Sequence, residues 1–175
     1  MENPHSNWEI AGLLLTLAAG TLLHFTYGWS GKNPAAAAFS AVNESTWEHM
    51  KLLAVPWLAW SLAEAAASGG AALFPRALGL LAGLAAIPAA FYTLTGMFGP
   101  THHLVNILLF LLAVLLAFAV SRLARESGRF RRRIWRLLGL VLLLTVGAMF
   151  LRWTYAAPDL PLFIDPLTGD SGLPG

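Results

Sequence analysis

Five apolar stretches of membrane-spanning length limit what this chain can fold into. They lie at about residues 8 to 27, 47 to 67, 77 to 98, 101 to 121 and 134 to 156. A helix of roughly 20 residues crosses a hydrocarbon core of about 30 Å. Only helices and closed barrels can span lipid, and none of the stretches alternates with the period of two that a strand requires. The sequence therefore predicts an all-α polytopic membrane protein with a bundle of five transmembrane helices.

The composition and the N-terminal segment agree with this prediction. Charged residues make up 11% of the 175 residues, whereas soluble domains have about a quarter. The segment before the first helix, "MENPHSNWE", contains Glu2 and Glu9 and no basic residue, which favours a retained helix over a secretory signal. We therefore expect a transmembrane domain at 1–157 and an extracytoplasmic C-terminal tail or lid at 158–175.

Basic residues gather at one side of the predicted bundle. Eight of the 11 lysines and arginines fall there: Arg76, Arg122, Arg125, Arg129, Arg131, Arg132, Arg133 and Arg136. The positive-inside rule places this side in the cytoplasm of a bacterial cell, with the N-terminus inside and the tail outside. The basic pI near 9.4 comes from this local block and not from a basic surface, which makes nucleic acid a poor candidate partner. The expected partners are the lipid bilayer and a lipid or small-molecule ligand.

The same topology collects most of the polar residues on the outer side, which predicts a functional site there. The absence of cysteine excludes thiolate ligands, so a metal site would use His, Asp or Glu. The outer side receives these residues: His24, Glu44, Glu48, His49, Tyr92, His102, His103, Asn106, Arg152, Tyr155, Asp159 and Asp165.

The segment "STWE" at 45 to 48 has a structural as well as a functional interpretation. It fits a capping box, in which Ser45 caps a helix and Glu48 returns a hydrogen bond. Glu44, Glu48 and Lys51 would share one helical face, where Glu48 and Lys51 can form a neutralising pair. Neither the capping box nor the Glu48–Lys51 pair accounts for His49, which leaves room for a functional role.

Several segments resemble an uncharacterised family of small bacterial integral membrane proteins, known as a domain of unknown function. The resemblance lies in "HFTYGWSG", "FSAVNESTWEHMKLL", "YTLTG" and "LPLFIDPLTG", and it implies an architecture without an activity. In addition, the SxxxH spacing of Ser45 and His49 is similar to a zinc-site motif of the superfamily of alkaline ceramidases and progestin receptors. The fifth predicted helix has no counterpart to the HxxxH pair of that superfamily.

The leading functional hypothesis is a metal-dependent membrane hydrolase. Zinc is the expected ion, with Mn²⁺ or Fe²⁺ as alternatives, and metal-free acid/base chemistry is a further alternative. Candidate ligands are His24, His49, one of His102 or His103, and Asp165, the last as a ligand or as a partner of one. Candidate catalytic groups are Glu44 or Glu48 as general base and Ser45. The residues expected to line the pocket or to bind substrate are Lys51, Tyr92, Asn106 and Arg152.

The rival hypothesis is a transporter, channel or solute-binding protein in which Glu44, Glu48 and Lys51 line a vestibule. Its weakness is that the inner half offers few matching polar groups besides Glu64. An accessory protein that binds a partner through its outer loops is a third alternative. For the tail, Leu160, Leu162, Phe163 and Ile164 supply residues to bury, which favours a lid carrying Asp165 toward the site over a loosely attached end.

Overall fold

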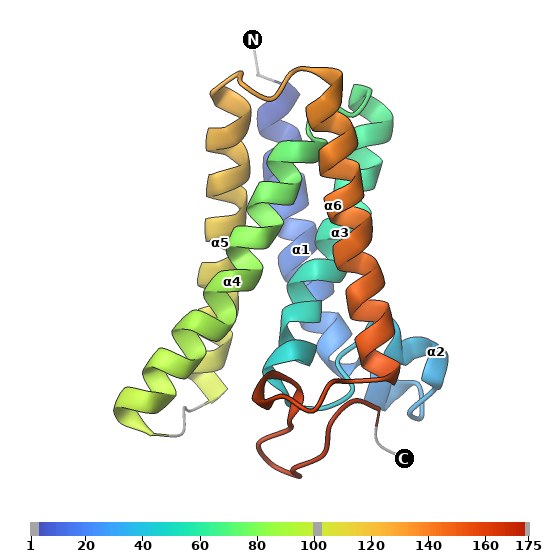
Figure 1. Cartoon of the computed structure of the whole chain (residues 1–175), viewed down its shortest axis with the longest axis vertical. Helices are drawn as coiled ribbons and strands as arrows, with labels where there is room; N and C mark the ends of the chain where they lie inside the picture. The colour runs from blue at the N-terminus through green and yellow to red at the C-terminus, as the bar shows by residue number, and fades with distance from the viewer. Residues whose placement is uncertain (1–3, 100–102, 174–175) are drawn as a thin grey trace.

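A computed structural model describes residues 4–99 and 103–173 of the chain, and within them the fold is helical (Figure 1). A short 3-10 turn, Pro161–Phe163, follows the last helix, and a single bridge between Ile164 and Ser171 is the only strand-like pairing in the described ranges. The all-α prediction is confirmed. The helices are α1 (Pro4–Trp29), α2 (Pro34–Ala37), α3 (Thr46–Ser68), α4 (Leu73–Phe98), α5 (His103–Glu126) and α6 (Arg133–Tyr155).

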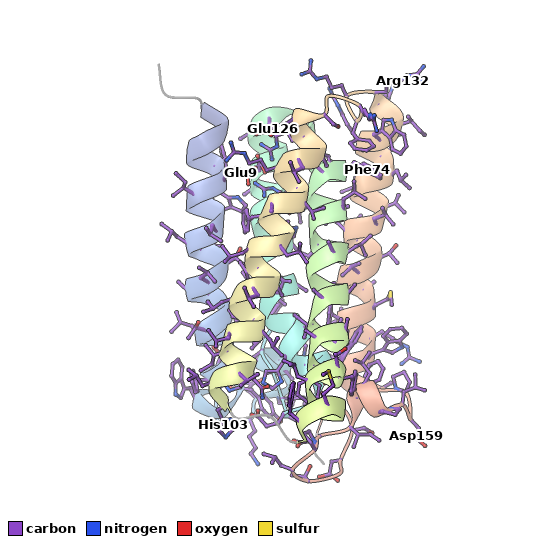
Figure 2. The ribbon with its side chains drawn as sticks, turned by 90° about the vertical axis from the view of Figure 1, so that its left-hand side faces the viewer. Glu9, Phe74, His103, Glu126, Arg132 and Asp159 are labelled. Carbon is purple, nitrogen blue, oxygen red and sulfur yellow. The ribbon has the colours of Figure 1, made fainter. Side chains whose placement is uncertain are left out.

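The five long helices run up and down, so the bundle has two distinct ends (Figure 1). The start of α1, the turn from α3 to α4 and the loop from α5 to α6 lie at one end, which we name the Arg-rich end. The loop after α1, the start of α3 and the C-terminal segment lie at the opposite end, which we name the site end. Figure 2 shows the same division, with Glu126 and Arg132 at the Arg-rich end and His103 and Asp159 at the site end.

Four of the long helices are long and apolar enough to cross a membrane: Trp8–Trp29 of α1, α4, α5 and α6. Large apolar side chains on them are exposed, among them Leu14, Leu112 and Leu144. Such wide apolar surfaces are typical of helices that face lipid. The four helices therefore indicate a membrane-embedded protein.

The helix α3 is of similar length but is more polar, because it contains Glu48, Lys51 and Glu64. It packs against α1, α4 and α6, and all three of these ionisable side chains are buried. Halfway along it, Leu53 and Trp57 join Leu80 of α4 in the core of the bundle. The position of α3 between other helices explains how it can be less apolar than its neighbours.

Small residues let α4 and α5 approach closely. Gly79 and Gly83 are one turn apart on α4, as in the small-xxx-small pattern of membrane helices. A Cβ atom on Gly79 would collide with the Ala117 carbonyl oxygen, and one on Gly83 would lie 3.0 Å from the Ala113 carbonyl oxygen. This contact fixes the two helices to each other near the middle of the bundle.

Candidate functional site

The start of α3 is built by a side-chain cap. The Ser45 hydroxyl accepts a hydrogen bond from the Glu48 backbone N–H at 3.3 Å, as the capping prediction requires. The reciprocal half of that prediction is wrong, because the Glu48 carboxylate turns to the Val42 N–H at 3.0 Å and to Lys51. Ser45 is 1% exposed, so its hydroxyl is enclosed at the cap.

Lys51 and Glu48 form a buried ion pair that fastens the loop before α3. The Lys51 ammonium lies 2.6 Å from Glu48 Oε2 and also donates to the carbonyl oxygens of Ala37 and Ser40, both at 3.0 Å. Its three donors are thus all used, and its side chain is fully buried. This arrangement confirms the predicted Glu48–Lys51 pair and gives it a structural role at the base of the loop.

His24, Glu44 and His49 come together beside this pair, from α1, the loop and α3 respectively. Glu44 lies between the two histidines, with Oε2 at 3.4 Å from His49 Nε2 and Oε1 at 3.9 Å from His24 Nε2. The two imidazole centroids are 5.4 Å apart. All three side chains are about one-third exposed, so the cluster is reachable from outside. We refer to these residues as the His–Glu–His cluster.

The backbone fixes the orientation of the His49 ring. His49 Nδ1 lies 3.0 Å from the Ser45 carbonyl oxygen. A carbonyl only accepts hydrogen bonds, so Nδ1 is the ring nitrogen that donates to Ser45, and Nε2 is the nitrogen that faces Glu44. A histidine held in this way through its second nitrogen is typical of metal ligands.

The donor atoms of the His–Glu–His cluster lie close enough together to hold a metal ion. One atom from each residue can be chosen so that all three lie within 4.8 Å of one another. Zinc bonds of about 2.0–2.1 Å in a tetrahedral site place ligand atoms about 3.3 Å apart. The Glu44–His49 distance of 3.4 Å is close to this value, whereas His24 Nε2 lies 3.9 Å from Glu44 Oε1, so His24 would have to move closer to hold the same ion.

The C-terminal segment lies against the loop that carries Glu44. The buried Asp165 accepts a hydrogen bond from the Glu44 N–H at 3.0 Å, and the Asn43 amide donates to the Gly172 carbonyl oxygen at 2.9 Å. Phe163 is buried against Trp47 of α3, with ring centroids 4.7 Å apart. Asp165 thus holds the backbone of a cluster residue and is itself outside the group of three possible ligands.

A pocket of about 490 Å³ opens beside the His–Glu–His cluster, between α3, α4, α5 and the C-terminal segment. Glu44 and His49 line one side, and His103 and Asn106 of α5 line another. In Figure 1 the site-end half of α4 diverges from α6. The remaining wall is largely apolar: Leu52, Ile87, Phe91, Leu109, Phe110, Pro166 and Leu167.

The other predicted site residues lie apart from this pocket. Tyr92 is 42% exposed on α4 and stacks edge-on with Phe91. Arg152 is exposed on the last turn of α6. Neither of the two is among the residues that line the pocket. His102 lies outside the residues that the structure describes.

An ionic network at the Arg-rich end joins four charged side chains that were not predicted to meet. Arg76 Nε lies 2.8 Å from Glu64 Oε2, and its Nη1 lies 3.1 Å from Glu9 Oε2. Arg125 bridges the same two carboxylates, at 2.8 Å from Glu64 and 3.3 Å from Glu9. Arg76 was expected in a loop, but α4 starts earlier than predicted and buries it against Trp57. One sign of this network is visible in the sequence: a charged residue lies near the same end of each of four apolar stretches.

Comparisons with known proteins place the chain without assigning an activity. Searches of curated proteins and of solved structures gave no match. One family model, described as a family of unknown function, matches residues 1–173. The resemblance to a domain of unknown function is therefore confirmed: the chain belongs to the family DUF6512.

Proposed function

We propose that this protein is a membrane-embedded, metal-dependent hydrolase whose metal ion is held by His24, Glu44 and His49. The observation that carries the proposal is the convergence of these three side chains from separate segments, two of which, Glu44 and His49, line a pocket. Two histidines and a glutamate form a ligand set of catalytic zinc sites, in which the fourth position binds water. Zinc is the proposed ion, and Mn²⁺ or Fe²⁺ suits the same ligands.

The surrounding contacts support His49 and Glu44 as metal ligands. The Ser45 carbonyl orients His49, and Asp165 orients the backbone of Glu44, so both ligands are held by partners behind them. A bound metal ion would lower the pKa of its water and supply a hydroxide nucleophile near neutral pH. His103, which also lines the pocket, would exchange a proton with the leaving group.

Neither predicted general base takes that role in this scheme, because Glu44 is assigned to the metal ion and Glu48 is buried. Its carboxylate is 2% exposed and contacts Lys51, whereas Glu44 lines the pocket. We assign Glu48 and Lys51 to holding the loop, with Ser45 as the helix cap. In this scheme Asn106, which lines the pocket, would bind a substrate oxygen.

We place all five long helices across the bacterial cytoplasmic membrane, with the Arg-rich end in the cytoplasm and the site at the outer leaflet. Burial of the ionisable side chains of α3 within the bundle supports its inclusion, because such groups in a membrane face the protein interior. The arginines of the α5–α6 loop support the orientation. The C-terminal segment would then be extracytoplasmic.

Transport is the alternative function, and it would require a polar path between the two ends of the bundle. Among the described residues, the middle of the bundle instead contains Leu53, Leu80 and Val114, all fully buried. The ammonium of Lys51, the proposed vestibule cation, is enclosed by the loop. These observations favour chemistry at one end of the bundle.

Hydrolysis of an amphiphilic ester tests the proposal. Purified protein in detergent is stripped with a chelator, reloaded with Zn²⁺, Mn²⁺ or Fe²⁺, and assayed with p-nitrophenyl esters of increasing chain length. We expect activity only after reloading and its loss in His49→Ala. His103→Ala should keep the metal and lose most of the rate, typically about 10²- to 10⁴-fold for a proton-transfer group. Hydrolysis that is unchanged by the chelator and by His49→Ala would contradict the proposal.

A further inference from the structure

A second cavity, of about 610 Å³, lies at the Arg-rich end, on the far side of the bundle from the His–Glu–His cluster. Its wall comes from the start of α1, the α3–α4 turn, the end of α5 and the α5–α6 loop. Figure 2 shows Glu9 and Glu126, two of its lining residues, at this end. The cavity falls in the range of about 300–1,000 Å³ that is typical of ligand pockets.

Four arginines line this cavity against two glutamates, and both glutamates are already paired. Glu126 binds Arg122 at 2.7 Å, and Glu9 lies 3.3 Å from Arg125. The other two arginines are Arg131 and Arg136, which have no ion pair among the described residues. The lining therefore has an excess of positive charge, and Arg131 and Arg136 supply it.

The guanidinium groups of these two arginines retain free donors. Arg136 donates through Nη1 to the Gly69 carbonyl oxygen at 3.2 Å, which anchors the side chain and leaves its other N–H groups available. The Arg131 guanidinium lies over Gly128, where a Cβ atom would be 3.7 Å from its Nε. Gly128 has φ of 67°, a left-handed conformation that suits glycine. The turn thus folds Arg131 back toward the cavity.

Apolar residues complete the lining. Ile10, Pro75 and Phe130 contribute side chains beside the arginines, and Phe130 is held by Phe74 and Trp135 at ring-centroid distances of 4.8 and 5.1 Å. A ligand that fits this wall has an anionic group next to an apolar or uncharged part. Arginine forks are suited to phosphate oxygens in particular.

We infer that this cavity binds a phosphate group through Arg131 and Arg136. The group comes either from the headgroup of an anionic phospholipid or from a free phosphate compound. Basic pockets between helices at the cytoplasmic side of membrane proteins can bind lipid headgroups. The inference is independent of the proposed metal site, because no residue is shared between the two cavities.

A charge-matched pair of variants tests the inference. Arg131→Gln/Arg136→Gln removes two cavity arginines, whereas Arg132→Gln/Arg133→Gln removes two neighbouring arginines that do not line the cavity. All four arginines are exposed. Both variants change the net charge equally. Arg131→Gln alone serves as a third variant, because it leaves the Arg136 hydrogen bond to Gly69 intact, and thermal unfolding checks that each protein is folded.

Two probes distinguish the sources of the phosphate. Native mass spectrometry of full-length protein from phosphatidylcholine nanodiscs, with and without phosphatidylglycerol, reports a retained lipid. Calorimetric titration of lipid-depleted protein with glycerol 3-phosphate reports a free phosphate compound. We expect either phosphatidylglycerol or glycerol 3-phosphate to bind wild type and the Arg132→Gln/Arg133→Gln control equally well. The same probe should bind Arg131→Gln/Arg136→Gln about tenfold or more weakly. Arg131→Gln alone should show an intermediate loss.

Retention of one phosphatidylglycerol would assign the site to a lipid headgroup, and binding of glycerol 3-phosphate would assign it to a soluble compound. Equal weakening in both double variants would show attraction to the basic loop as a whole and would overturn the inference. Binding of neither probe to wild type would overturn it as well.

Discussion

At the scale of single residues, the site end separates residues that hold the fold from residues that are available for chemistry. Lys51 and Glu48 are sealed together, with the ammonium bound to two loop carbonyl oxygens as well. His24, Glu44 and His49 keep about one-third of their side-chain surface exposed. Because a buried charge is stable only with its partner, the two groups should respond differently to mutation.

We predict that Lys51→Met destabilises the protein strongly. It leaves the Glu48 carboxylate buried without its cation, and loss of one partner of a buried pair costs about 3–5 kcal/mol. The double variant Glu48→Gln/Lys51→Met removes both charges and should regain part of this loss. Thermal unfolding in detergent measures the effect. If Lys51→Met melts like wild type, the ammonium does not hold the loop.

The sequence allowed part of this site to be predicted. His24, Glu44 and His49 could be placed together because a charge-based topology brings the end of α1 and the start of α3 to one side. The burial of Lys51 could not be foreseen, since it depends on carbonyl oxygens of Ala37 and Ser40, and backbone groups have no sequence signature. The fold of the loop decides which carboxylate faces the pocket.

At the scale of elements, the lengths of the apolar stretches predicted the bounds of the long helices to within a few residues. Which helices contact one another could not be predicted. The network of Glu9, Glu64, Arg76 and Arg125 requires knowledge of which helices touch, and hydropathy does not provide it. The close contact of α4 with α5 depends on Gly79, and it can be tested directly.

We predict that Gly79→Ala destabilises the bundle, whereas Gly96→Ala on the same helix does not. The Gly79 methyl group would collide with the Ala117 carbonyl oxygen, while nothing lies within 4 Å of the corresponding position at Gly96. Overpacking typically costs about 1–3 kcal/mol, and Ala in place of an unhindered helical Gly is favourable. Equal melting temperatures of the two variants would contradict this account of the α4–α5 contact.

At the scale of the whole molecule, the orientation in the membrane follows from which end faces the cytoplasm. The chain has no cysteine, so single cysteines can be labelled without background. Ser127, next to Glu126 at the Arg-rich end, and Asp170, in the C-terminal segment at the site end, are both exposed (Figure 2). We predict that an impermeant thiol reagent labels Asp170→Cys and not Ser127→Cys in intact cells, and that lysis exposes both. The reverse pattern would invert the topology, and labelling of both in intact cells would contradict the spanning arrangement.

The central claim is that His24, Glu44 and His49 hold a metal ion, and the metal content of purified protein tests it most directly. Elemental mass spectrometry on wild type, His24→Ala, His49→Ala and Ser45→Ala after equilibration with Zn²⁺ gives the stoichiometry of each. We predict one zinc per chain in wild type and in Ser45→Ala, which loses only its helix cap, at about 0.5–2 kcal/mol. Both histidine variants should lose the metal while remaining folded. Zinc content that is equal in wild type, His24→Ala and His49→Ala, or absent from all of them, would contradict the claim.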